Sequence, residues 1–304
     1  GLAARVREEI DESISASEEN QEVVTALEQQ HDAEVANWSN ELPSGDELMD
    51  QIEQFLAGRE DPESPYLAFV ASACDYRGGK RGPMEGDKAG LSPAQMDRAT
   101  GAMVGLAVGN ALGSGYAFQP KPHPVEVRML PGGLGPYALG EWADDTAMAL
   151  PILQAAAEGR DLLDPATQDA VAAAWVEWST GAKDAAPLIS KVLAAHDPAL
   201  GAESLRRAAA VLHASGSSGA GNASLMRTTP VAVAYLDDAE ATAHAARIYS
   251  DLTHGNPTAA EACILWNLAQ REAILTGRFD IRAGIAHLPE SRRAYWEDLF
   301  VQAE

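Results

Sequence analysis

The sequence predicts an all-α protein. Four long, alanine-rich segments are typical of helices, and they span residues 165–178, 202–214, 239–252 and 257–275. Signals for β-strands are scarce and are limited to residues 125–130. An architecture of packed helices, with long loops that carry the chemistry, follows from this balance.

The first part of the chain is expected to be an acidic helical extension, residues 1–60. Apolar residues recur every four positions over residues 2–14, and a second apolar stripe covers residues 48–56. Residues 61–90 are rich in Gly and Pro and are predicted to form a linker. The main helical domain is then assigned to residues 91–304.

That domain opens with a clear helix start. Ser92 is a capping residue, Pro93 suits the first helical position, and Gln95 completes a capping box. Four glycines then fall on one face of the helix, at Gly101, Gly105, Gly109 and Gly113. Glycine costs about 1 kcal/mol relative to alanine inside a helix, so the row indicates a close backbone or ligand. We expect tight helix packing at the first two glycines and a ligand-facing turn over residues 109–115.

Charge limits the partners of the chain. The formal net charge is −23, and residues 1–60 carry sixteen acidic residues against three arginines. Nucleic acid polymers and anionic membranes would be repelled, so we expect neither as a partner. The acidic segment has two interpretations: a solvated helical face that keeps the protein in solution, or a binding surface for a basic protein partner.

Cysteine usage and hydropathy indicate a cytoplasmic protein. Only Cys74 and Cys263 occur, too few for a disulfide framework. No apolar run reaches the length that spans a bilayer, and no basic and then apolar leader opens the chain. With 304 residues, 46% of them hydrophobic, the chain has room for one large domain and an appendage.

Residues 140–148 are the most informative stretch, because two adjacent aspartates and a threonine open an apolar helical run. Adjacent carboxylates repel, so a fold that holds both needs a nearby cation or a helix N-terminus. Asp144, Asp145 and Thr146 offer the oxygen ligands that Mg²⁺ takes. The alternative from the residues alone is an Asp or Thr that caps a helix and does nothing more.

Two later segments could contact a ligand. The Gly-rich residues 219–222 precede an apolar helix that is expected to start near Leu225, and the amides of such a turn can hold a phosphate. His254 follows Thr253 at a predicted helix end. Each segment also has a simpler explanation, an ordinary loop for the first and a favourable helix dipole for the second.

Four segments, in this order and spacing, resemble the ADP-ribosylglycohydrolase family, the relatives of dinitrogenase reductase-activating glycohydrolase. They are residues 97–113, 140–148, 219–230 and 252–255. The resemblance extends from residue 97 to about residue 280 and implies an orthogonal all-α ADP-ribosylglycohydrolase-like domain. It implies hydrolysis of a glycosidic bond at the distal ribose of ADP-ribose, through an oxocarbenium-like state, with two Mg²⁺ ions.

The resemblance also assigns roles to residues. Asp144 and Asp145 become catalytic residues and, with Thr146, ligands of Mg²⁺. His254 would donate a hydrogen bond to the pyrophosphate or the distal ribose. The full set of implied substrate contacts is Asn110, Gly219, Ala220, Gly221, Asn222 and His254.

The chain departs from the family pattern at several positions. Ala117 occupies the position of a family glutamate near the scissile bond, Ala143 replaces a hydroxyl residue, and Asn110 stands where the family often has aspartate. A late Gly-Asp-x-Asp-Thr motif has no counterpart after His254. We expect the chain to lack its last helices, because loss of whole core helices by divergence would strip packing from the remaining ones.

The function predicted from these residues is Mg²⁺-dependent removal of ADP-ribose from a modified protein, nucleobase or small molecule. The alternative is a catalytically impaired protein that binds ADP-ribose, or an immunity protein that inhibits an ADP-ribosyltransferase toxin. Ala117, Ala143 and the missing late motif favour the alternative, whereas Asp144, Asp145 and His254 are compatible with both.

Overall fold

The computed structural model of the chain describes residues 90–117, 128–133, 135–183, 185–216 and 221–303. The chain divides into two compact units, and the helical unit considered below comprises Pro62–Phe118 and Met129–Glu304. Its described elements are α5 (Pro93–Ser114), α6 (Asp144–Ala157), α7 (Pro165–Ser179), α8 (Pro187–Leu193), α9 (Ala202–Ala214), η1 (Leu225–Arg227), α10 (Thr229–Ala234), α11 (Ala239–Asp251), α12 (Pro257–Thr276), η2 (Ile281–His287) and α13 (Glu290–Ala303).

The all-α fold expected from the sequence is confirmed. The described residues form no strand, and their one sheet-like pairing is an isolated bridge between Gly132 and Tyr137. The four alanine-rich segments became α7, α9, α11 and α12, with boundaries within one residue of those expected. No described helix is long and apolar enough to cross a membrane.

Local sequence explains where these helices begin and end. The Ser92 hydroxyl accepts a hydrogen bond from the Gln95 amide at 3.3 Å, and the Gln95 side chain accepts one from the Ser92 amide at 2.9 Å. This reciprocal pair is the predicted capping box. Asn256 caps α12 by accepting from the Thr258 amide at 2.8 Å, and Gly277 ends that helix with a φ of 80°.

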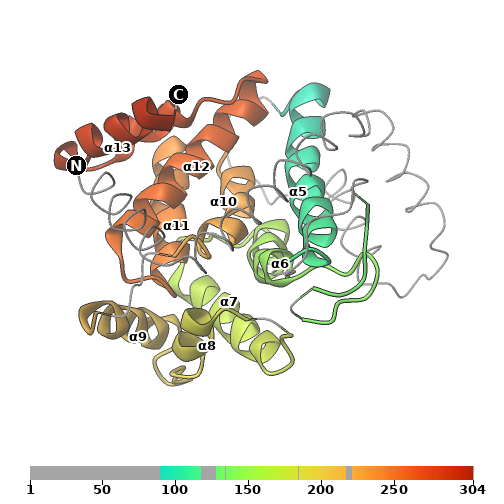
Figure 1. Cartoon of the computed structure of the whole chain (residues 1–304). Coiled ribbons are helices and arrows are strands. Elements are labelled where there is room, and N and C mark those ends of the chain that lie inside the picture. Colours follow the sequence, from blue (N-terminus) through green and yellow to red (C-terminus); the bar gives the residue numbers. More distant parts are fainter. Residues whose placement is uncertain (1–89, 118–127, 134, 184, 217–220, 304) are drawn as a thin grey trace, which may run out of the picture. The chain divides into compact units, whose positions relative to one another are not determined.

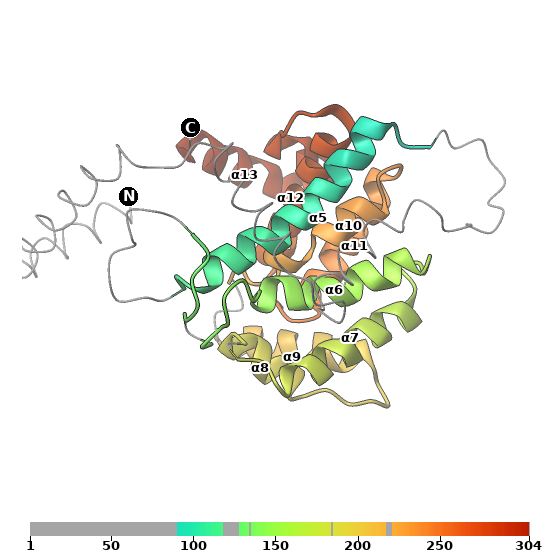
Figure 2. The same cartoon turned by 90° about the vertical axis from the view of Figure 1, so that its right-hand side faces the viewer.

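Helices α12 and α6 each pack against several other elements of the unit. Contacts join α12 to α5, α10, α11 and η2, and join α6 to α5, α7 and α10 (Figure 1). Helices α7, α8 and α9 gather at one end of the unit, while α5 crosses α10 and α12 and continues beside α6 (Figure 2). Helix α6 therefore lies where helices from distant parts of the sequence meet.

The core beneath α6 is built around aromatic side chains. Trp175 and Tyr249 are fully buried and meet edge to face, with 6.4 Å between ring centroids. The Trp175 indole donates a hydrogen bond to the Met148 carbonyl at 2.8 Å, so α7 is tied to the first turns of α6. An edge-to-face aromatic pair contributes about 1 kcal/mol beyond the burial of its area.

The prediction of a ligand-facing turn over residues 109–115 is wrong. Gly109 and Gly113 lie inside α5, which continues to Ser114, and all four glycines of the row are exposed. A Cβ added at any of them would meet no atom of the described residues within 4 Å. Close packing by those residues therefore does not explain the glycine row.

The glycines that permit close approach lie just beyond α5. Gly115 is buried, and a Cβ there would collide with the Leu130 carbonyl. Gly133 has a φ of 76°, and its Cβ would collide with the Ser114 carbonyl. The loop before α6 can therefore lie directly on the end of α5 because both positions lack side chains.

Several further elements differ from the sequence prediction or lie outside the described residues. Helices α8 and α13 and the 3₁₀ helix η2 were not anticipated as separate elements, and the helix expected near Leu225 is the short η1 followed by α10. Residues 128–130 form no strand, while the rest of the segment 125–130 lies outside the described residues. The predicted helical extension, residues 1–60, also lies outside the described residues. So does the predicted linker, residues 61–90, except for residue 90.

Two glycine substitutions should have opposite effects on stability. A Cβ at Gly255 would lie 2.5 Å from the Ala209 carbonyl and 2.9 Å from the His213 Cβ, so Gly255→Ala should destabilise the fold by on the order of 1–3 kcal/mol. Gly105→Ala, in the exposed middle of α5, should stabilise it by about 0.5–1 kcal/mol. Urea unfolding of both variants measures the difference, and equal effects would contradict the packing assigned to Gly255.

Candidate functional site

The first turn of α6 begins without a capping side chain of its own. Ala143 is its N-cap residue, and the methyl side chain of Ala143 cannot form a hydrogen bond. The side chain of Asn110, from α5, takes over this function: its carbonyl oxygen accepts from the Ala143 amide at 2.8 Å, the Thr146 amide at 3.3 Å and the Thr146 hydroxyl at 2.9 Å. A residue from another helix thus satisfies the amides that a Ser or Asp at the start of α6 would ordinarily satisfy.

The other end of the same amide orients Asp145. The Asn110 Nδ2 donates to the Asp145 Oδ2 at 2.5 Å. The sequence identified Asn110 as a substrate contact, whereas the structure shows it joining α5 to the paired aspartates. An aspartate at position 110 would place a third carboxylate against Asp144 and Asp145, so the neutral amide lowers the repulsion within this cluster.

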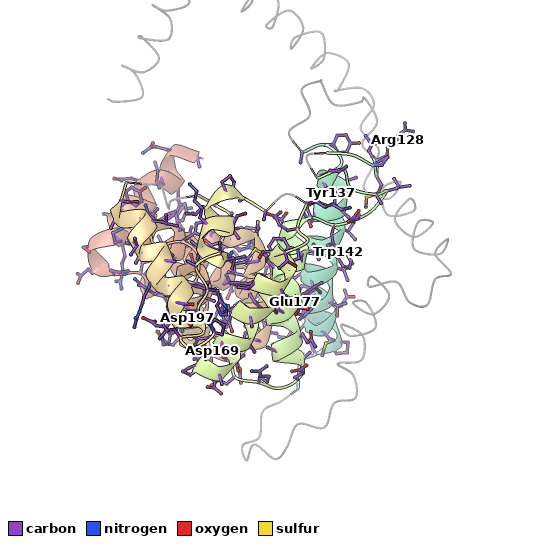
Figure 3. The ribbon with its side chains drawn as sticks, turned by 90° about the horizontal axis from the view of Figure 1, so that it is seen from below. Arg128, Tyr137, Trp142, Asp169, Glu177 and Asp197 are labelled. Carbon is purple, nitrogen blue, oxygen red and sulfur yellow. The ribbon has the colours of Figure 1, made fainter. Side chains whose placement is uncertain are left out.

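Contacts of Trp142 and Glu141 hold the loop that leads to Asp144 in place. Trp142 packs against the buried Met103 and Ala107 of α5. Glu141 forms an ion pair with Lys183 at 2.6 Å, and its backbone carbonyl accepts from the Ser114 hydroxyl at 2.9 Å. Figure 3 shows Trp142 beside α5, on the ribbon that leads into α6. The ion pair is exposed and contributes little stability, so Trp142 is the main anchor.

The buried guanidinium of Arg227 packs against Met148 of α6. Arg227 has 0% relative exposure, and its guanidinium carbon lies 4.3 Å from the centroid of the Trp175 ring. Its Nη1 lies 3.8 Å from the Met148 sulfur, one helical turn after Asp144. Burial lowers the pKa of Arg227 to about 10, and the negative charge of Asp144 opposes that shift. Arg227 therefore stays positive at neutral pH and attracts Asp144.

Arg227 also reaches the predicted Thr253-His254 segment. Its Nη2 donates to the Tyr249 carbonyl at 2.8 Å and to the Thr253 hydroxyl at 2.6 Å. The Thr253 hydroxyl lies 2.7 Å from the His254 Nδ1. Sequence reasoning gave Arg227 no function; the available signal was a single charged side chain in the segment from 219 to 230, among small, apolar and hydroxyl residues.

His254 is held in its neutral form. It has 1% relative exposure, and burial, reinforced by the charge of Arg227, lowers its pKa to about 3. A Cβ on Gly221 would lie 3.7 Å from the His254 Nε2, so two segments predicted to share a site do meet. Gly221 and Asn222 are exposed, while Gly219 and Ala220 lie outside the described residues.

Buried polar groups support the segment that follows Gly221. The Ser250 hydroxyl donates to the Ser224 hydroxyl at 2.9 Å, and Asn267 donates to the Thr228 hydroxyl at 2.8 Å. Burial raises the pKa of Cys263, which lies 3.5 Å from the Ser224 hydroxyl, so this thiol is protonated and unreactive. Residues from α11 and α12 thereby fix the position of η1 and of Arg227.

The donor set fits Mg²⁺ in part. Asp144 and Asp145 are two half-buried carboxylates in the first turn of α6, the number that Mg²⁺ often takes from a protein. Thr146 fits poorly, because it has 0% relative exposure and its hydroxyl donates to Asn110. The described residues contain no group of three acidic, histidine or cysteine side chains placed to hold a metal ion. Asp144 and Asp145 are the carboxylates present for the Mg²⁺ that the resemblance implies, and Mg²⁺ binding at them stays a prediction.

Position 117 brings no acid to the site. Ala117 lies three residues beyond the end of α5, where its amide donates to the Gly113 carbonyl at 3.1 Å. Its side chain is a methyl group, which cannot transfer a proton. The carboxylates that the resemblance assigns to the site are Asp144 and Asp145, at the start of α6.

The neutral state of His254 should appear in the pH dependence of folding. Its folded pKa of about 3 lies below the ordinary value of 6.5, so between these values the unfolded chain binds more protons and stability falls as pH falls. His254 should contribute a loss of on the order of 1 kcal/mol per pH unit in that window. His254→Gln should reduce the slope, measured by urea unfolding at about pH 7, 6 and 5.

The matched control is His244→Gln, because His244 is an exposed histidine of α11. Its slope should equal that of the unsubstituted chain. The buried neutral state assigned to His254 would be contradicted by a His254→Gln variant whose stability falls with pH as steeply as that of the control.

Comparison with known proteins places the chain among its relatives. It is 48% identical over 61 residues to ADP-ribosylarginine hydrolase Tri1 of Pseudomonas putida (strain GB-1), an alignment that covers 20% of this chain and 16% of that protein. It is 49% identical over 57 residues to the protein of the same name from Serratia proteamaculans (strain 568), covering 18% of this chain and 15% of that one. The alignments thus span about a sixth of the length of these relatives.

A solved structure titled "ADP-ribosylglycohydrolase-related protein complex" is 32% identical, with a TM-score of 0.45, and the alignment covers 60% of this chain and 58% of that one. The family model described as ADP-ribosylglycohydrolase matches residues 91–303, which is most of the chain and includes every described helix. The chain belongs to the ADP-ribosylglycohydrolase family.

Proposed function

We propose that this protein removes ADP-ribose from an ADP-ribosylated partner, with Mg²⁺ bound at Asp144 and Asp145. The observation that carries the proposal is the meeting of separate segments around Arg227, whose guanidinium donates to Thr253 beside His254 and is attracted by Asp144. These are the segments in which the family resemblance places its ligand contacts. Buried hydrogen bonds hold these segments in place, which supports the proposal.

Several residues of this chain would contact the ligand or orient the groups that act on it. Gly221 and the Nε2 of His254 lie together and would contact the phosphates or distal ribose of the ligand. Asn110 holds the Asp145 carboxylate through its amide, so that carboxylate is oriented before a substrate arrives. Bound Mg²⁺ would supply positive charge to orient ribose hydroxyls and offset the two aspartates.

The reaction would be a hydrolysis. The bond between the anomeric carbon and the leaving nitrogen or oxygen breaks, and a water oxygen bonds to that carbon. One proton leaves the attacking water, for which a carboxylate at the start of α6 is the available acceptor, and the leaving group gains a proton. An arginine-linked substrate is supported by the names of the two relatives, which are ADP-ribosylarginine hydrolases.

A second candidate is a protein that binds ADP-ribose without turnover, as an inhibitory or immunity protein would. Ala117 favours it, because a methyl group stands where the family has a glutamate, and the described residues hold only two carboxylates together at the start of α6. Binding through loop amides and His254 would not need those missing acids. The two candidates differ in one measurable quantity, the release of free ADP-ribose.

Restoring a carboxylate at position 117 should raise that release. Ala117→Glu should increase the rate of ADP-ribose release from an arginine-ADP-ribosylated protein by at least about tenfold with Mg²⁺ present, because a general acid or base contributes about 10²–10⁴-fold when well placed. Ala117→Gln is the matched control, since it has nearly the same size but cannot transfer a proton. Chromatography of released ADP-ribose over time measures both rates.

Three results are informative. Slow release by the unsubstituted chain, faster with Ala117→Glu only, supports the hydrolase. Binding of ADP-ribose without release by any of the three chains supports the binder. Absence of binding at millimolar ADP-ribose in calorimetry, with and without Mg²⁺, would overturn both candidates.

Mg²⁺ should stabilise the fold through the paired aspartates. At an ion concentration about ten times its Kd, binding to the native state alone adds about 1.4 kcal/mol to the free energy of unfolding. Asp145→Asn should remove most of this gain, because it removes one of two charged ligands and part of the repulsion that the ion relieves. Asp97→Asn, at an exposed position of α5, should keep the full gain. Thermal unfolding with and without MgCl₂ tests the pair, and equal gains in both variants would remove the ion from this site.

A further inference from the structure

The buried Arg227 ends in a short hydrogen-bonded chain that leads towards the ligand segment. Its Nη2 donates to the Thr253 hydroxyl at 2.6 Å, and that oxygen lies 2.7 Å from the His254 Nδ1. All three residues are at most 1% exposed, so solvent does not share these contacts. The direction of each hydrogen bond can therefore be worked out from the donors and acceptors that the groups possess.

Arg227 can only donate, because a guanidinium has no acceptor. The Thr253 oxygen accepts its proton, and the hydroxyl still has one proton of its own to donate. Within the described residues, the His254 Nδ1 is the acceptor placed to receive it. A buried hydroxyl that donates to nothing would cost about 1–3 kcal/mol, which favours the arrangement in which Thr253 donates to Nδ1.

This direction fixes the tautomer of the imidazole. A neutral histidine carries one ring proton, and a ring nitrogen that accepts cannot carry it. The proton of His254 therefore sits on Nε2. Nε2 is also the nitrogen that lies beside Gly221, where an added Cβ would be 3.7 Å away.

We propose that Arg227 is a positioning residue that acts through Thr253 to hold His254 as a neutral hydrogen-bond donor, with its Nε2–H directed to the Gly221 segment. The ligand group it would serve is an acceptor, a phosphate or hydroxyl oxygen of ADP-ribose, so the identity of the ligand rests on the proposed function. The tautomer itself does not. Arg227 need not touch the ligand for this role.

Electrostatics supports the assignment. Burial disfavours a positive charge on the imidazole, and the positive charge of Arg227 acts in the same direction, so the pKa of His254 is lowered to about 3. Asp144, in the first turn of α6, attracts Arg227 and helps to retain the guanidinium in its buried position. One buried cation therefore acts electrostatically on both Asp144 and His254.

The tautomer can be measured without any ligand. Long-range ¹H–¹⁵N correlation spectra of the full chain, labelled with ¹⁵N-histidine, distinguish Nδ1–H from Nε2–H, and His254→Gln assigns the resonance. The unsubstituted chain should show the Nε2–H form at neutral pH. An Nδ1–H form, or a charged ring, would overturn the proposal whether or not the variants fold.

Position 253 offers a matched pair of variants. Thr253→Val keeps the shape but removes the hydroxyl, and should yield a mixture of tautomers and weaken ADP-ribose binding about tenfold. Thr253→Ser keeps the hydroxyl and should leave the tautomer unchanged and the Kd within about twofold. Calorimetry measures the affinity, and the spectra measure the tautomer. A pure Nε2–H form with unchanged affinity in Thr253→Val would overturn the role of the hydroxyl.

Substitution of Arg227 tests the cation itself. Arg227→Lys retains a positive donor and should retain the Nε2–H form, whereas Arg227→Met should yield mixed tautomers and a His254 pKa closer to its ordinary value. If Arg227→Met does not fold, the Thr253 pair and the unsubstituted chain still decide the outcome. Should the tautomers follow this pattern while no ADP-ribose binds, the proposed function fails and the positioning role of Arg227 stands.

Discussion

The arrangement of the site depends on one buried positive charge. Arg227 lies at 0% exposure against Trp175, donates to two groups of the segment 249–253, and attracts Asp144 at the start of α6. An unpaired buried charge would cost several kcal/mol, so each of these contacts is needed to retain it. The stacked indole and the backbone carbonyl of Tyr249 replace part of the water that the guanidinium loses, while its Nε has no hydrogen-bond partner among the described residues. Residues 144, 227 and 254 thereby share one electrostatic environment, although they are far apart in the sequence.

Much of the fold could be predicted because it follows from local rules. The capping box at Ser92, the capping Asn256 and the length of the alanine-rich segments each depend on neighbouring residues only. The role expected for the glycine row was wrong because a period of four indicates which face a residue occupies but not what lies against that face. The glycines that matter for close approach, Gly115 and Gly133, are isolated in the sequence, and their requirement arises from the tertiary contact between two loops.

The family resemblance named the segments that meet at the candidate site. The sequence did not predict the hydrogen bonds between their residues. The meeting of His254 with Gly221, and of Asn110 with the paired aspartates, agrees with the segments that the family resemblance brought together. The capping of α6 from α5 could not be read from the sequence, because Asn110 and Ala143 are 33 positions apart. Arg227 was overlooked for a similar reason, since its significance lies in its burial. The roles of Thr146 and of Mg²⁺ remain predictions that depend on ligand binding.

The capping of α6 by Asn110 would make folding independent of the Mg²⁺ binding that we propose. In small metal-dependent domains the ion supplies free energy without which the chain stays unfolded, so the apo state does not persist. Here a neutral amide satisfies the amides of Ala143 and Thr146 and holds Asp145 by a hydrogen bond, while the helix N-terminus and Arg227 offset the remaining negative charge. The two aspartates can therefore adopt their folded positions before any ion arrives. A divalent cation would bind to a site that is already formed. Loss of the cation would leave the helical unit folded and able to bind a cation again.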